Sequence, residues 1–168
     1  ELQQLEITPQ LQNVLDSQGL IGKVYAEAKY DLLQSTEQPK LDELEMDTQT
    51  ALEAANYLLQ SDKAQRSVSA LKLFRAILED NPTNPEALSR QALLLAQTGD
   101  RVLFQRSIDQ INYAADQNPN NIEVLLTRAI LISGTDSKVA CSDLNTVSKL
   151  LELETTQVPV QVSEQVDS

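Results

Sequence analysis

Residues 81–98 read NPTNPEALSRQALLLAQT, and residues 118–135, which begin 37 residues later, read NPNNIEVLLTRAILISGT. Eight of these eighteen positions are identical, including the opening Asn-Pro pair, a further asparagine, and two leucines and one alanine. A self-match with a period between about 20 and 50 residues is the signature of a helical repeat array. We therefore predict an all-α fold built from antiparallel pairs of helices.

The composition supports a helical domain without catalytic chemistry. Hydrophobic residues make up 41% of the 168 residues, whereas four glycines and six prolines are few for an all-β protein. A net charge of −12 argues against binding of nucleic acid. The chain has no histidine, which excludes a histidine-activated nucleophile. We predict no enzymatic activity, no catalytic residue, no metal site and no cofactor.

The periodicity divides the chain into three parts. Residues 1–50 are expected to form N-terminal capping helices, including one over about 20–34. A helical stretch over about 40–60 leads into three pairs, at about 51–82, 85–119 and 122–154. Acidic residues at 42–47 are expected to favour the N-terminus of that stretch. Residues 155–168 contain valines around Pro159 and are expected to be an extended or flexible tail.

From about residue 51 to 154 the chain resembles the tetratricopeptide-repeat family. The small, large and closing residues of that motif correspond here to Ala70, Phe74 and Pro82, to Ala92, Gly99, Ala114 and Pro119, and to Ala129 and Ala140. The period of 37 residues departs from the usual length of about 34. The large aromatic residue expected early in each first helix is also replaced, by Ala54, Leu88 and Leu125.

A second resemblance concerns residues 51–96, with the segments YLL, SDK and ALKLF followed by NP. This run is similar to the repeat region that follows the membrane anchor in ToxR-type and CadC-like winged-helix regulators. The resemblance implies an extracytoplasmic, periplasmic sensory or assembly domain of a bacterial membrane-anchored protein. The first residue, Glu1, fits a piece of a longer chain.

The resemblance to tetratricopeptide repeats implies a peptide-binding groove on the concave side, lined by the first helix of each pair. The candidate groove residues are Leu52, Ala55, Leu59, Glu86, Ser89, Leu93, Glu123, Leu126, Ile130 and Ser133. The basic and amide residues that clamp a terminal carboxylate in chaperone-binding members are missing, apart from Arg90. The implied partner is a protein or peptide with an apolar or basic segment, the chain's own tail, or a second copy.

Two questions stay open at this stage. Leu93, Leu126 and Ile130 belong either to the groove or to the core, because the two positions differ by one step around a helix. The main alternative to protein binding is a small-ligand sensor, with the ligand between the cap and the first pair near Tyr25, Tyr30 and Tyr57. The single cysteine, Cys141, follows Ala140 at a predicted helix crossing and is expected to be a small buried residue.

Overall fold

The computed structural model describes residues 8–17 and 19–156, and all regular structure in these ranges is helical. In chain order the helices are α1 (Pro9–Ser17), α2 (Ile21–Ala28), α3 (Tyr30–Ser35), α4 (Thr48–Leu59), α5 (Ala64–Asp80), α6 (Pro85–Ala96), α7 (Arg101–Gln117), α8 (Ile122–Ile132) and α9 (Ser137–Thr156). The predicted all-α fold is therefore confirmed. Helix α9 continues to Thr156, and the rest of the predicted tail lies outside the described residues.

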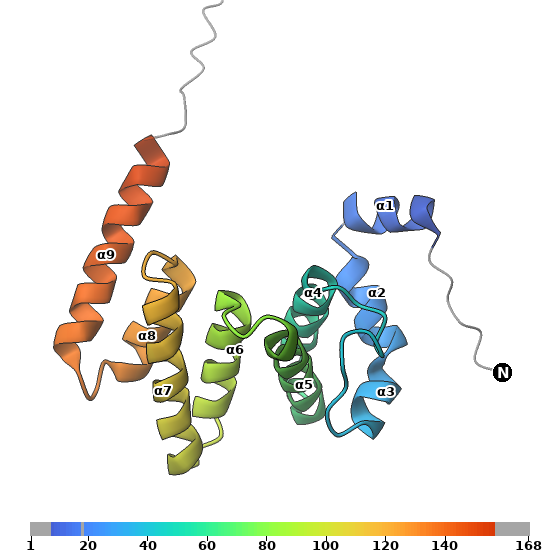
Figure 1. Ribbon diagram of the computed structural model, residues 1–168, viewed down its shortest axis with the longest axis horizontal. Coiled ribbons are helices and arrows are strands. Elements are labelled where there is room, and N and C mark those ends of the chain that lie inside the picture. The colour runs from blue at the N-terminus through green and yellow to red at the C-terminus, as the bar shows by residue number, and fades with distance from the viewer. Residues whose placement is uncertain (1–7, 18, 157–168) are drawn as a thin grey trace, which may run out of the picture.

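The last six helices form three successive pairs, α4 with α5, α6 with α7, and α8 with α9 (Figure 1). Four residues join the two helices of each pair. Helices that pack along each other across so short a connection run in opposite directions. Neighbouring pairs also pack together, through α5 against α6 and through both α6 and α7 against α8. The pairs thus follow one another in a row.

The asparagines repeated in the self-match begin equivalent helices. The side-chain oxygen of Asn84 accepts a hydrogen bond from the backbone N–H of Ala87 at 2.9 Å, and that of Asn121 accepts one from Val124 at 3.0 Å. The first turn of a helix leaves such N–H groups without a partner in the helix itself. The two asparagines therefore fix the starts of α6 and α8.

The apolar residues repeated in the self-match pack at equivalent places. Leu88 and Leu125 are buried on α6 and α8, and so are Ala92 and Ala129. Alanine lets two helices approach closely, while each buried leucine stabilises the fold by about 1.5–3 kcal/mol. The sequence repeat is therefore a repeat of packing.

Helices α2 and α3 cover the first pair, with α2 against α4 and α3 against α5. Gly22 lies where α2 crosses α4, and a Cβ atom at this position would be 2.5 Å from the carbonyl carbon of Glu53. On the other helix of the pair, Lys72 donates hydrogen bonds from Nζ to the carbonyl oxygens of Leu33 and Thr36, both at 2.7 Å. These contacts attach the N-terminal helices to the array.

Two helices differ from the sequence prediction. The helix expected over 20–34 is divided at Lys29 into α2 and α3, and the one expected over 40–60 begins only at Thr48. Of the acids at 42–47, only Asp47 caps a helix, by accepting a hydrogen bond from the Thr50 N–H at 2.7 Å. The turns before it include Glu45, whose φ is 55°.

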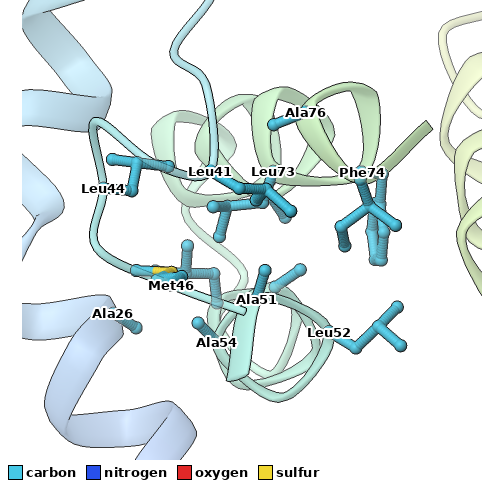
Figure 2. Packing of buried hydrophobic residues seen from close by; sticks show 14 of the residues in the cluster. Ala26, Leu41, Leu44, Met46, Ala51, Leu52, Ala54, Leu73, Phe74 and Ala76 are labelled. Atoms are coloured by element: carbon cyan, nitrogen blue, oxygen red, sulfur yellow. The ribbon is translucent and has the colours of Figure 1, made fainter. Parts of the chain in front are cut away.

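The reason for these turns is burial. Leu41, Leu44 and Met46 are all buried in the largest hydrophobic cluster, and Figure 2 shows Leu41 beside Leu73 of α5 and Met46 near Ala26 and Ala54. At about 3.6 residues per turn, a continuous helix would point Met46 away from Leu41 and Leu44. Irregular backbone brings all three side chains into the core, and tertiary packing here overrides the helical spacing of the sequence.

Candidate interaction surface

The first helices of the three pairs share one accessible side, which we call the first-helix surface. Its residues follow helical spacing on each helix and recur about 37 residues apart. They are Gln49, Glu53 and Asn56 on α4 with Gln60 directly after it, Glu86, Arg90 and Leu93 on α6, and Glu123 and Ile130 on α8. All of these side chains are half-buried or exposed.

Polar contacts join neighbouring first helices along this surface. Asn56 of α4 donates a hydrogen bond from Nδ2 to Oε1 of Glu86 on α6, at 2.6 Å. Arg90 of α6 forms an ion pair with Glu123 of α8, with 2.9 Å between Nε and Oε1. These contacts fix the side chains of three separate helices relative to one another.

The surface is acidic at its centre. Burial raises the pKa of Glu123 above its ordinary value, and the neighbouring charge of Glu86 raises it further, while Arg90 opposes both effects. Glu53 adds a third carboxylate on α4 and accepts a hydrogen bond from Gln49 at 2.9 Å. Three carboxylates against one guanidinium leave this region with an excess of negative charge.

The apolar character of the surface increases toward α8. Asn56, Leu93 and Ile130 occupy equivalent positions in the three pairs, 37 residues apart. Asn56 and Leu93 are half-buried, whereas Ile130 is 65% exposed. An isoleucine this exposed forgoes most of the stabilisation that burial would provide. Along these equivalent positions the first-helix surface therefore changes from polar at Asn56 to apolar at Ile130, while Glu123 keeps a carboxylate on α8.

Three of the predicted groove residues do not line this surface. Leu52, Ala55 and Ser89 are buried. Each lies about one step around its helix from the accessible side, and helical periodicity alone does not distinguish a groove position from a core position one step away. Leu59 is half-buried near the end of α4, and Ser133 is exposed just after α8. Leu126 is 38% exposed, so neither it nor Ile130 is a core residue.

Asn56 and Glu53 belong to the surface but are absent from the predicted groove. Asn56 lies 37 residues before Leu93, so the repeat spacing carried a signal for it. Its hydrogen bond to Glu86 on another helix could not be predicted from the sequence, because a contact between side chains 30 residues apart depends on how the helices pack.

Two of the three tyrosines predicted to hold a small ligand, Tyr30 and Tyr57, contact charged side chains of the protein itself. Arg66 lies over the ring of Tyr30, 5.0 Å from its centre, and 6.0 Å from the centre of the Tyr57 ring. Tyr57 also donates a hydrogen bond from its hydroxyl to Glu27 at 3.1 Å, and Glu27 forms an ion pair with Arg66 at 2.8 Å. This cluster connects α2, α3, α4 and α5.

A pocket of about 690 Å³ lies between α1, α2 and α4. Polar side chains predominate in its lining, which includes Tyr57 but neither Tyr25 nor Tyr30. A larger hollow of about 910 Å³ surrounds the turn between α6 and α7, within residues 96–109. It lies on the second-helix side of that pair and includes no residue of the first-helix surface.

Cys141 is exposed, and the expectation that it is buried is wrong. The buried small residue at this crossing is Ala140, its neighbour in the chain. Adjacent residues on a helix point about 100° apart, so only one of the two can face α8. The neighbouring sequence did not show which one.

Within the described ranges, no three residues of the His, Cys, Asp or Glu type are grouped so as to hold a metal ion. A search of the same residues for a helix long and apolar enough to span a membrane found none. The sequence matches no protein-family model and no curated protein.

Proposed function

We propose that this chain is a non-catalytic protein-interaction domain, a tetratricopeptide-like array that binds a segment of another protein along its first-helix surface. The observation that carries the proposal is the exposed Ile130, which continues the line of Asn56 and Leu93 beside the carboxylates of Glu86 and Glu123. Exposed apolar side chains at the edge of charged ones are typical of surfaces that bind proteins.

The chemistry of the surface defines the partner segment. Basic side chains complement the carboxylates of Glu53, Glu86 and Glu123, and one or two apolar side chains next to them cover Leu93 and Ile130. Attraction between opposite charges speeds association and selects orientation, while burial of Ile130 contributes affinity. The preferred segment is therefore basic at one end and apolar at the other.

Synthetic peptides test this directly. Peptides with lysines in one half and leucines in the other are titrated against the full chain by fluorescence anisotropy, beside peptides in which glutamates replace the lysines. Ile130→Glu should weaken binding of the basic–apolar peptide at least tenfold, about 1.4 kcal/mol. Because the side chain is exposed, the substitution should leave the melting temperature within a few degrees of wild type.

Val102→Glu is the matched control, because Val102 is 70% exposed and lies on α7, outside the first-helix surface. It should bind as wild type does. Equal losses in the two variants, or equal binding of the lysine and glutamate peptides, would contradict the proposal. Added salt should weaken binding, since the carboxylates act through charge.

The more specific proposal is that this domain is the extracytoplasmic sensory or assembly part of a bacterial membrane-anchored transcriptional regulator. Its support is the similarity of residues 51–96 to the repeat region of such regulators. The sequence of the full-length gene tests it: an upstream winged helix followed by one membrane span supports this proposal, and a gene that codes for neither refutes it.

A small polar ligand in the pocket between α1, α2 and α4 is the second candidate function, favoured by the polar lining of that pocket. A thermal-shift screen distinguishes the two functions. Stabilisation by a small compound that Lys23→Met or Tyr57→Phe reduces would support the sensor, because both residues line the pocket and neither belongs to the first-helix surface. Peptide binding without any stabilising compound would favour the interaction domain.

A further inference from the structure

Equivalent positions on the three first helices differ in burial at one end of the array. Leu52, Ser89 and Leu126 follow one another at intervals of 37 residues. The first two are buried, whereas Leu126 is 38% exposed. A further helical pair follows the first and the second pair, but none follows the third within the described residues. We conclude that the next helical pair covers this position in the first and second pairs, at Leu52 and Ser89.

The second helices repeat this pattern. Asp100 and Asp136, 36 residues apart, both accept hydrogen bonds from backbone N–H groups at the starts of α7 and α9, which aligns the two helices. On α7, Ile108 packs on the cluster that contains Ala129 of α8, and Ala115 is buried in a cluster with Val124 of α8. These α7 positions therefore contact the following pair.

Their equivalents on α9, 36 residues later, are Leu144 and Leu151. These leucines are 49% and 46% exposed. Ser148 is exposed between them, one turn from each. Together with Leu126, these side chains form what we call the C-terminal end face. It has the composition and position of a surface on which another helical pair packs.

The other end of the array is already covered. Helices α2 and α3 pack on α4 and α5, so that the N-terminal helices occupy one end of the row and α9 the other (Figure 1). A second copy therefore has no equivalent open N-terminal end to offer. A second copy can offer the same apolar face to the C-terminal end face, and pairing of a surface with itself leads to a closed two-fold dimer.

We infer that the C-terminal end face binds the C-terminal end face of a second copy of this chain, with the two α9 helices side by side and antiparallel. This interaction is separate from partner binding by the first-helix surface.

Charge supports this pairing. The chain carries a net charge of −12, so two copies repel each other except where the contact area lacks acids. The C-terminal end face consists of three leucines and a serine. At its margins, α9 has Lys138 near its start and Glu152 near its end, both exposed and both on the same flank of the leucine stripe at about 100° per residue. Two antiparallel helices related by a two-fold axis bring like flanks together, so this arrangement places the lysine of each copy beside the glutamate of the other.

An alignment of the two α9 helices centred on residue 146 leaves Lys138 of one copy within two residues, along the helix axis, of Glu152 of the other. It also places Leu144 opposite Ser148, and Cys141 opposite Leu151, of the second copy. All of these residues are exposed on α9. The proposed dimer therefore has defined pairs of contacting side chains.

The first test is the mass of the full chain by analytical ultracentrifugation over a series of concentrations. Wild type should approach twice its mass of 18.6 kDa. Leu144→Glu combined with Leu151→Glu should remain monomeric while keeping the helical circular-dichroism spectrum, since both side chains are exposed. Val102→Glu, exposed but outside the face, should dimerise like wild type. A wild type that stays monomeric at the highest soluble concentration overturns the inference. The same result is expected if residues 157–168 or another protein, and not a second copy, binds the face.

The second test does not depend on how the glutamate variants fold. In Leu151→Cys, the new thiol should form an interchain disulfide with Cys141 of the second copy under mild oxidation, seen as a covalent dimer on a non-reducing gel. The two positions cannot be joined within one helix, because ten residues separate them by about 15 Å, beyond the roughly 7 Å that a disulfide tolerates. Val102→Cys should give no covalent dimer. Efficient cross-linking of wild type through Cys141 alone would instead indicate parallel helices and overturn the antiparallel arrangement.

Discussion

The ion pair between Arg128 and Asp143 offers the sharpest test of how the last pair of helices is held together. Arg128 of α8 donates two hydrogen bonds to Asp143 of α9, from Nε to Oδ2 at 2.8 Å and from Nη2 to Oδ1 at 2.6 Å. The side chains are only 17% and 5% exposed. Hydrogen bonding to Asp143, together with the charge of that carboxylate, raises the pKa of Arg128 above its ordinary value.

Arg128→Met keeps an unbranched side chain but removes the positive charge. Asp143 is then left buried without the partner that compensates its desolvation. Breaking a buried ion pair in this way costs about 3–5 kcal/mol. The free energy of unfolding of a domain of this size is about 5–15 kcal/mol, so the loss should be a large fraction of it. Combining Arg128→Met with Asp143→Leu removes both charges and should recover most of that loss.

Urea unfolding followed by far-ultraviolet circular dichroism measures these differences. Arg90→Met is the matched control, because its ion pair with Glu123 is more exposed, at 41% and 37%, and should contribute about 1 kcal/mol or less. A loss below about 1 kcal/mol in Arg128→Met would refute the reasoning. So would a double variant no more stable than the single one, since relief of the uncompensated carboxylate is the proposed cause.

Three further predictions concern the same unfolding free energy. Gly22→Ala should destabilise by about 1–3 kcal/mol, because its Cβ would lie 2.5 Å from the Glu53 carbonyl carbon, whereas Gly134→Ala, with open space around it, should be neutral or stabilising in the same melts. Lys72→Met should cost about 1.5–3 kcal/mol and speed amide exchange in α3, since the charged donor to the α3 carbonyls is lost; unchanged exchange would contradict this role. Glu123→Gln should be more stable than wild type at neutral pH and equal to it in acid. Burial raises the pKa of Glu123 in the folded state, so wild type loses stability as the pH rises from the ordinary glutamate value through the raised one. A variant less stable at neutral pH would show that attraction to the neighbouring arginine outweighs burial.

Much of the secondary structure could be read from the sequence because its signals are local. The self-match located α6 and α8, and its Asn-Pro segments marked where α5 and α7 end. Leu88, Ala92 and Leu95, which recur at helical spacing in the self-match, are all buried. Capping and helical periodicity act between residues at most a few positions apart, so the chain itself carries the information.

The rotation of each helix against its neighbours was not accessible in this way. Cys141 and Ala140 are adjacent, yet only Ala140 is buried. Ser89 and Leu93 both fit the accessible side of α6, yet only Ser89 is fully covered. One step around a helix changes the direction of a side chain by about 100°, and local preferences do not distinguish such steps.

The sequence by itself determined an all-α chain, its three pairs of helices and the caps that begin α6 and α8, because these depend on contacts close along the chain. Tertiary structure alone decided the irregular segment at 40–47, where burial of Met46 beside Leu41 and Leu44 outweighed helical spacing. It also decided which side chains of α4, α6 and α8 share one surface, through contacts such as that between Asn56 and Glu86. The physical reason is that burial and electrostatic contact depend on distances in space, which are set only when separate helices pack together.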